Sequence, residues 1–254
     1  IDTETRKEYW RPALARLAGL DPDQAKIWLS ADQAEILCTR YNRTDYIRSE
    51  YYGALGFQFL SQIEDKLIYQ DIAQRLLVIL YQYRGFYDLS FPFFRREISV
   101  AEKWGYHLRY CGFLFHYATA QSYAGRNLIA AEIYKQVIRK TDQFRMVPNI
   151  EWYHTSALLG SATIANQSGH YQKSLAICDQ IENLTPDINQ RISMHTTRGI
   201  TQLYLSHYDD AEKEYKQALG LAVVSNDILN QIIALRNIGL LYFRLTEHEK
   251  AIHY

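Results

Sequence analysis

Few residues of this chain stand in the patterns that chemistry requires. A phosphate-binding loop needs clustered glycines ahead of a lysine at a helix start, and the close glycine pair Gly53 and Gly56 lacks that context. Zinc sites need histidine or cysteine ligands at short, paired spacing, whereas the 8 histidines are scattered. His248 and His253 are five residues apart and face different sides of a helix. We expect no nucleotide site, no metal site and no cofactor.

Residue patterns for enzyme catalysis are also weak. Nucleophilic catalysis requires a serine or cysteine in a strained turn beside a histidine, but the Gly-Ser-Ala-Thr segment at residues 160–163 lies within a predicted helix, where small residues serve packing. The carboxylate pairs at residues 64–65 and 209–210 fall at helix ends or on exposed faces, where solvation and the helix dipole account for them. The sequence therefore predicts a protein that is not an enzyme.

Charge and composition limit the possible partners. The 254 residues include 28 basic and 28 acidic side chains, so the chain lacks the net positive charge that drives binding to nucleic-acid phosphates. The apolar run at residues 76–83 is too short to cross a bilayer. Cys38, Cys111 and Cys178 are odd in number and far apart, which favours a reducing compartment. We expect a cytoplasmic protein with no direct nucleic-acid binding and no membrane insertion.

Self-similarity along the chain is the strongest structural pattern. Relative to Gly199, turn, small and aromatic residues stand nine, twelve, sixteen and nineteen positions later, at Tyr208, Ala211, Tyr215 and Ala218. The same frame starts again at Gly239, Ala162, Ala118 and, more weakly, Val78. Small residues let two antiparallel helices approach, glycine permits the tight turn, and aromatic residues fill gaps between hairpins. This pattern closely resembles the tetratricopeptide repeat.

The resemblance implies an all-α fold, a right-handed superhelix of antiparallel helix hairpins that forms an α-solenoid. We expect about five repeats in residues 71–254, the last one truncated because residue 254 falls one turn into its second helix. This unfinished hairpin indicates a piece of a larger protein. Residues 1–70 fit no repeat frame and are predicted to form N-terminal capping helices. One is expected around residues 4–20, one from Asp21-Pro22-Asp23, and one from a Ser30–Gln33 capping box.

The repeats are longer than usual. Successive anchors lie 40, 44, 37 and 40 residues apart, whereas the usual repeat has about 34 residues. Such long repeats resemble those in sensor domains of bacterial transcription activators, signal-transduction ATPases and peptide-pheromone receptors. The resemblance implies the ligand-sensing or docking part of a larger bacterial regulatory protein, which acts on an effector domain. A passive assembly scaffold within a multiprotein complex is the alternative.

The resemblance also implies where a partner binds. In this fold the first helix of each hairpin lines the concave face, and the helical period places groove-facing residues at fixed offsets from each anchor. The offsets predict a groove formed by Arg75, Gln82, Tyr83, Phe115, Tyr123, Asn166, Gln167, Thr196, Tyr204, Arg236, Phe243 and Arg244, with Thr119 and Thr163 beside them. Amides bond to peptide groups, arginine binds carboxylates, and tyrosine supplies rigid contact area. We expect a peptide or protein partner, with docking of a domain of the same parent protein as the alternative.

Overall fold

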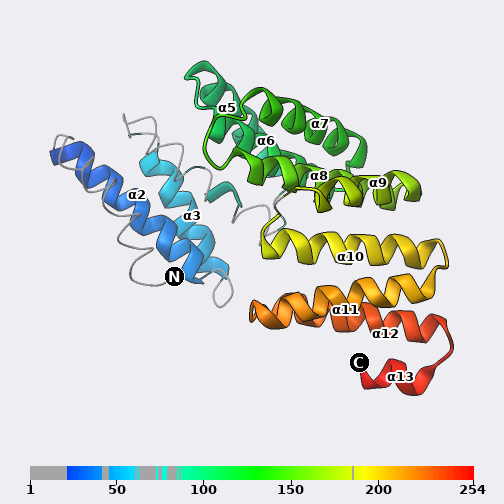
Figure 1. Cartoon of the computed structure of the whole chain (residues 1–254). Coiled ribbons are helices and arrows are strands. Elements are labelled where there is room, and N and C mark those ends of the chain that lie inside the picture. Colours follow the sequence, from blue (N-terminus) through cyan, green and yellow to red (C-terminus); the bar gives the residue numbers. More distant parts are fainter. Residues whose placement is uncertain are drawn as a thin grey trace. The chain divides into compact units, whose positions relative to one another are not determined.

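The computed structural model describes residues 22–41, 46–60, 62, 73, 76–78, 85, 87–184 and 186–254. Throughout these residues the regular secondary structure is α-helical, without a β-strand (Figure 1). The chain divides into two compact units, Ile1–Phe113 and Leu114–Tyr254. The predicted all-α fold is confirmed, whereas the predicted domain boundary at residue 70 lies outside the described residues.

The first unit contains a tight helical hairpin. Helices α2 (Pro22–Tyr41) and α3 (Tyr46–Leu60) pack along each other, and Ser49 Oγ donates a 2.8 Å hydrogen bond to the carbonyl oxygen of Cys38. A Cβ atom at Gly53 would lie 3.3 Å from Cys38 Sγ, and one at Gly56 would lie 2.9 Å from Leu76 Cδ1. The glycine pair therefore permits close packing. Helix α5 (Tyr87–Lys103) belongs to the same unit.

The helix boundaries near the N-terminus differ from the sequence prediction. A new helix was expected to begin at Ser30, but α2 continues through this position for 20 residues. Ser30 Oγ donates to the carbonyl oxygen of Lys26 at 2.9 Å, so its hydroxyl is satisfied inside the helix and does not cap a new one. The helix expected around residues 4–20 lies outside the described residues.

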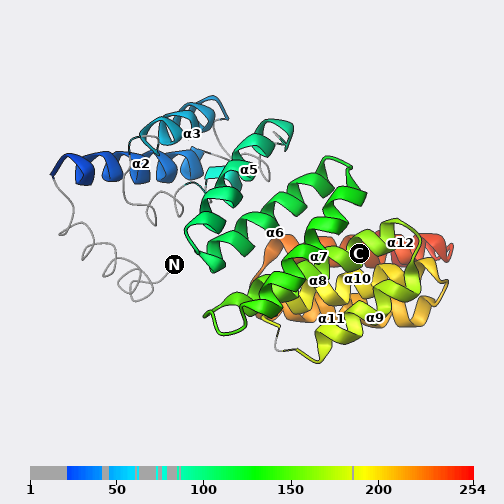
Figure 2. The same cartoon turned by 90° about the horizontal axis from the view of Figure 1, so that it is seen from above.

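The second unit is a series of helical hairpins that succeed one another along the chain (Figure 1, Figure 2). Its helices are α6 (His107–Tyr123, from Leu114 on), α7 (Asn127–Gln143), α8 (Ile150–Gln167), α9 (Tyr171–Glu182), α10 (Ile188–Tyr204), α11 (Tyr208–Val224), α12 (Ile228–Arg244) and α13 (His248–His253). Helices that are adjacent in sequence pack together, as α7 does with α8 and α10 does with α11. The hairpins therefore form by local pairing of consecutive helices.

The turn within each hairpin has a common geometry. The second helices α7, α9, α11 and α13 begin nine residues after the anchors Ala118, Ala162, Gly199 and Gly239, as the repeat frame predicts. In each turn a backbone N–H donates to a carbonyl five residues earlier, such as His207 to Gln202 at 2.9 Å. The residue before the donor has a positive φ, which is 76° at Gly125 and Gly169, 64° at Ser206 and 61° at Thr246. Two of these turns thus hold a non-glycine residue in the left-handed region.

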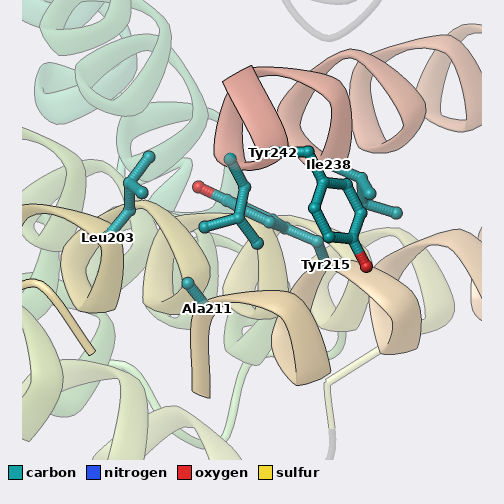
Figure 3. Close-up of a cluster of buried hydrophobic side chains, with 6 residues drawn as sticks. Leu203, Ala211, Tyr215, Ile238 and Tyr242 are labelled. Carbon is teal, nitrogen blue, oxygen red and sulfur yellow. The ribbon is translucent and has the colours of Figure 1, made fainter. Parts of the chain in front are cut away.

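A tyrosine from a second helix fills the core between two hairpins. Tyr215 of α11 is 1% exposed and packs with Leu203 of α10 and with Ile238 and Tyr242 of α12 (Figure 3). A Cβ atom at Gly199 would lie 2.6 Å from Tyr215 Cε1. Since Gly199 has no side chain, the tyrosine ring can approach the backbone of α10 and link it to α12.

Candidate ligand-binding groove

The first helices of the hairpins, α6, α8, α10 and α12, present residues in three rows. The members of each row stand at equivalent repeat positions: Phe115, Leu159, Thr196 and Arg236; Thr119, Thr163, Ile200 and Leu240; Tyr123, Gln167, Tyr204 and Arg244. Successive members on one helix are four residues apart, so they lie on the same helix face. We call this surface the groove rows. None of its residues is acidic.

A cavity of about 370 Å³ opens on the groove rows of α6 and α8, and residues of α10 that lie beside the rows, Ser193 and Thr197 among them, complete its lining. We call it the groove pocket. Its lining combines aromatic rings with hydroxyl groups and includes Phe115, Thr119, Tyr123, Trp152, Thr163 and Ser193. Three successive hairpins therefore contribute to one concave site.

Aromatic rings form one wall of the groove pocket. The Phe115 ring meets the Trp152 ring edge-on, with centroids 5.7 Å apart, and lies 6.0 Å from the ring of Tyr153. Trp152 is 42% exposed and Tyr123 is 54% exposed. These large, partly exposed rings offer apolar surface that a bound molecule can cover.

Tyr134 reaches the groove pocket from a second helix, α7. Its hydroxyl oxygen lies 3.0 Å from Thr119 Oγ1, and burial raises the pKa of Tyr134 to about 12. A side chain at Gly160 would collide with the Tyr134 ring, so this glycine admits the ring into the pocket. The sequence frame assigned Tyr134 to packing between helices, and the structure shows that it also lines the groove pocket.

Polar contacts join α8 to α10 at the edge of the groove pocket. Asp187 and Gln190 form a capping box at the start of α10, with hydrogen bonds of 2.8 and 3.1 Å. Asp187 Oδ2 also accepts a 2.9 Å hydrogen bond from Trp152 Nε1, and Gln190 Nε2 donates to the carbonyl oxygen of Trp152 at 3.0 Å. The repeat frame does not include these residues, although Asp-x-x-Gln directly after Pro186 is a recognisable capping pattern.

A second cavity, of about 400 Å³, shares the Trp152–Asp187 pair with the groove pocket. It lies at the end of α7 and the start of α8, off the groove rows. Thr141 Oγ1 and His154 Nδ1 are 2.9 Å apart in its lining, and burial lowers the pKa of His154. The Trp152–Asp187 hydrogen bond thus belongs to the walls of both cavities.

A cationic cluster lies on the groove rows of α10 and α12. The guanidinium group of Arg244 stands over the Tyr204 ring, 5.5 Å from its centroid, and the Tyr204 ring stacks on that of Tyr171. Burial raises the pKa of Tyr215, while Arg244 and Arg236 act in the opposite direction. Arg236 precedes Arg244 by eight residues on the same face of α12. We call Tyr204, Arg236 and Arg244 the arginine patch.

Most of the described residues that the sequence predicted for the groove lie on the groove rows. Phe115 and Tyr123 line the groove pocket, and Tyr204, Arg236 and Arg244 form the arginine patch. Gln167 is exposed and accepts a 3.1 Å hydrogen bond from Asn127, whereas Thr196 is half-buried. Arg75, Gln82 and Tyr83 lie outside the described residues. Ligand contact by all of these side chains stays a prediction.

Asn166 and Phe243 lie away from the groove rows. Both stand at the repeat position of the core residue Leu203, one residue from a row, and one residue turns the side chain about 100° around the helix. Asn166 is 6% exposed, and its Oδ1 atom has no hydrogen-bond partner within the described part of the chain. Phe243 is 62% exposed, with its ring 5.8 Å from that of His248. Ligand contact by Asn166 and Phe243 stays a prediction.

The described residues contain no group of three or more histidine, cysteine, aspartate or glutamate side chains that could hold a metal ion. No helix in this part of the chain is long and apolar enough to cross a membrane. Cys38, Cys111 and Cys178 are buried, and burial raises the pKa of the Cys178 thiol to about 12. Sulfur chemistry at Cys178 is therefore suppressed at neutral pH.

Solved structures resemble this fold. The apo form of the quorum sensor NprR from B. thuringiensis matches with a TM-score of 0.70 and 14% identity, over 99% of this chain and 69% of that chain. BtubC (BKLC) from P. vanneervenii matches with a TM-score of 0.54 and 17% identity, over 92% of this chain and 88% of that chain. No protein-family model and no curated protein matches the sequence. At these identities the likeness concerns the fold, a solenoid of stacked helical hairpins.

Proposed function

We propose that this chain, which has a tetratricopeptide-like fold, is a non-catalytic module that binds a peptide or an extended protein segment. It serves as the ligand-sensing or docking part of a larger bacterial regulatory protein in the cytoplasm. The observation that carries the proposal is the groove pocket, a cavity of about 370 Å³ on the face formed by the first helices. This volume falls within the range of roughly 300–1,000 Å³ that is usual for ligand sites.

The lining of the groove pocket suits a peptide. Phe115 and Trp152 supply apolar surface for a side chain of the ligand. Thr119 Oγ1 donates to the carbonyl oxygen of Phe115, and Thr163 Oγ1 donates to that of Leu159. Each hydroxyl has its hydrogen engaged by the helix. Thr119 Oγ1 then accepts from the Tyr134 hydroxyl and keeps one lone pair, whereas both lone pairs of Thr163 Oγ1 can accept hydrogen bonds from peptide N–H groups. The pocket therefore offers both contact area and backbone recognition.

Binding at this place has a direct route to regulation. A ligand in the groove pocket contacts α6, α8 and α10 together, and thereby favours one relative placement of three successive hairpins. A ligand that binds one arrangement better than another shifts the population towards it. The likeness to a structure described as a quorum sensor supports this regulatory role.

Selection from a peptide library tests the proposal. The purified chain is incubated with pooled random octapeptides. The retained peptides are then titrated while thermal stability and tryptophan fluorescence are followed, with Trp152→Phe as the variant that identifies the contribution of Trp152 to the emission of the 4 tryptophans. A ligand present at one hundred times its dissociation constant stabilises a protein by about 2.7 kcal/mol. We therefore expect a rise in the melting temperature that depends on peptide concentration, together with a change in Trp152 emission.

A blocking variant identifies the site. Thr163 is exposed and lines the groove pocket, so the indole of Thr163→Trp fills the cavity without entering the core. We expect this variant to lose peptide binding and to keep its helical content. The matched control is Lys173→Trp at an exposed position of α9, which should bind normally. Unchanged affinity in Thr163→Trp would place the binding surface elsewhere and contradict the proposal.

A further inference from the structure

The arginine patch bears on the chemistry of the ligand. Arg236 and Arg244 are exposed and stand in the first and third groove rows of α12, two helical turns apart. Their Cα atoms are separated by about 12 Å along the axis. Both arginines belong to the groove rows of one helix and are therefore on the same helix face.

The charges of the arginine patch are not neutralised by the described residues. Among these residues, no carboxylate oxygen lies within 4.0 Å of either guanidinium group. By contrast, Arg145, Lys216 and Lys250 each have a carboxylate partner. The groove rows add no acidic residue. Two like charges on one surface repel each other, and an anion placed between them relieves that repulsion.

Stacking holds one of the two guanidinium groups in place. Arg244 lies over the Tyr204 ring at 5.5 Å, and the Tyr204 and Tyr171 rings are stacked with an interplanar angle of 11°. A side chain that is already restrained loses less conformational entropy when a ligand binds. The stack therefore reduces the conformational entropy that Arg244 loses when it binds a ligand.

A buried amide next to Arg236 has an unused donor. Asn237 is 4% exposed, and its Nδ2 atom has no hydrogen-bond partner among the described residues, while its Oδ1 atom accepts a 3.4 Å hydrogen bond from Arg236. Asn237 stands at the repeat position of Thr197 and Gly160, which both line the groove pocket. A buried donor without an acceptor is unfavourable, and this one belongs to the side chain whose Oδ1 atom contacts the exposed Arg236.

We propose that the arginine patch binds the carboxylate groups of an acidic peptide, an apolar side chain of which occupies the groove pocket. Guanidinium groups bind carboxylates through paired, charge-assisted hydrogen bonds. The patch lies on the groove rows, and the row residues Phe115 and Thr163 line the pocket, so one extended peptide that follows the rows can contact both. This inference rests on the proposed function and adds the charge of its ligand.

Paired peptide libraries test the charge of the ligand. The 254-residue chain is incubated with two pools of random octapeptide amides, one containing aspartate and glutamate and the other asparagine and glutamine at the same positions. We expect the acidic pool to be enriched by about tenfold or more. The affinity of acidic peptides should fall as salt rises, because salt screens exposed charges. Equal enrichment of the two pools would overturn the inference.

Variants of the arginine patch connect this preference to its residues. Arg236→Gln with Arg244→Gln should weaken acidic peptides by about tenfold or more and leave neutral peptides unchanged. Replacement of both by lysine should restore part of the affinity, since lysine keeps the charge without the paired donors. The control, Arg139→Gln with Lys213→Gln, removes the same charge from exposed positions of α7 and α11.

The outcomes separate the inference from the proposed function. Retained affinity for acidic peptides in the doubly substituted glutamine variant, with normal helicity, would overturn the inference. Tight binding of peptides without acidic preference would overturn the inference and leave the proposed function standing. No binding of any octapeptide by the unsubstituted chain would overturn both.

Discussion

The ring of Tyr215 occupies the space that Gly199 leaves open on α10, where a Cβ atom would lie 2.6 Å from Cε1 and 2.7 Å from Cδ1 of the tyrosine. Gly199→Ala would force this buried ring to move within the cluster that joins α10 to α12. Overpacking of this kind costs about 1–3 kcal/mol. We expect the free energy of unfolding, measured by urea denaturation, to fall by that amount.

Gly220 is the matched control for this substitution. It lies within α11, and no atom approaches an added Cβ within 4 Å. Gly220→Ala should therefore raise the free energy of unfolding by about 0.5–1 kcal/mol, the usual gain of alanine over glycine inside a helix. If Gly199→Ala and Gly220→Ala both raised the free energy of unfolding, the open space at Gly199 would not be required for the Tyr215 ring.

The turn between α12 and α13 stores backbone strain at Thr246, a β-branched residue with φ of 61°. The left-handed region costs an L-residue roughly 1–2 kcal/mol, whereas glycine adopts it freely. Thr246→Gly should raise the free energy of unfolding by up to about 1 kcal/mol, because the flexibility of glycine in the unfolded chain offsets part of the gain. The gain in stability is measured as the difference in melting temperature between Thr246→Gly and the unsubstituted chain.

The reverse change at an equivalent turn checks this explanation. Gly125 has φ of 76° and no atom within 4 Å of an added Cβ, so an alanine there meets backbone strain alone. Gly125→Ala should lower the free energy of unfolding by about 1 kcal/mol. A neutral Gly125→Ala, together with a destabilising Thr246→Gly, would mean that backbone strain does not govern these turns.

Asp187 links the start of α10 to the indole of Trp152, so its removal should have two separable effects. Asp187→Ala loses the helix cap, which costs about 0.5–2 kcal/mol, and frees the indole N–H, which should shift Trp152 fluorescence. Asp227→Ala removes the corresponding cap of α12, in which Asp227 Oδ1 accepts a hydrogen bond from the backbone N–H of Asn230. It should lower stability and leave the fluorescence of the folded protein unchanged. The same spectral shift in both variants would contradict the assigned contact.

The repeat frame could be predicted because it depends on residue size at fixed spacing. A small residue such as Gly199 permits a close helix approach, and the turn that follows needs a fixed number of residues, so the start of α11 at Tyr208 follows from the anchor. The α2–α3 hairpin lies outside that frame, because the close approach of its helices depends on Ser49, Gly53 and Gly56, which do not follow the repeat spacing.

The groove could be predicted only in part. Offsets along one helix give the rows that contain Phe115 and Arg236, because they depend on the helical period alone. The pocket wall at Trp152 and Asp187 depends on how α8 and α10 are placed side by side, which the spacing within one repeat does not contain. Tyr134 belongs to a different helix of the hairpin and reaches the pocket because Gly160 lets its ring pass.

His116 should make stability depend on pH in a defined window. Burial lowers the pKa of His116 from 6.5 to about 4, and its ring contacts those of Phe115 and Tyr153 edge-on. Between these two values the unfolded chain binds a proton that the folded chain excludes, so this contribution to stability is present above pH 6.5 and is lost as pH falls towards 4. We expect a loss on the order of 1–3 kcal/mol over this range.

The free energy of unfolding is measured at several pH values for the unsubstituted chain and for His116→Phe. In His116→Phe, the decrease in the free energy of unfolding that is due to His116 should be absent. His170→Phe, at an exposed position before α9, is the control and should keep the slope. Parallel pH profiles for the unsubstituted chain and His116→Phe would show that the proton is not excluded at this site.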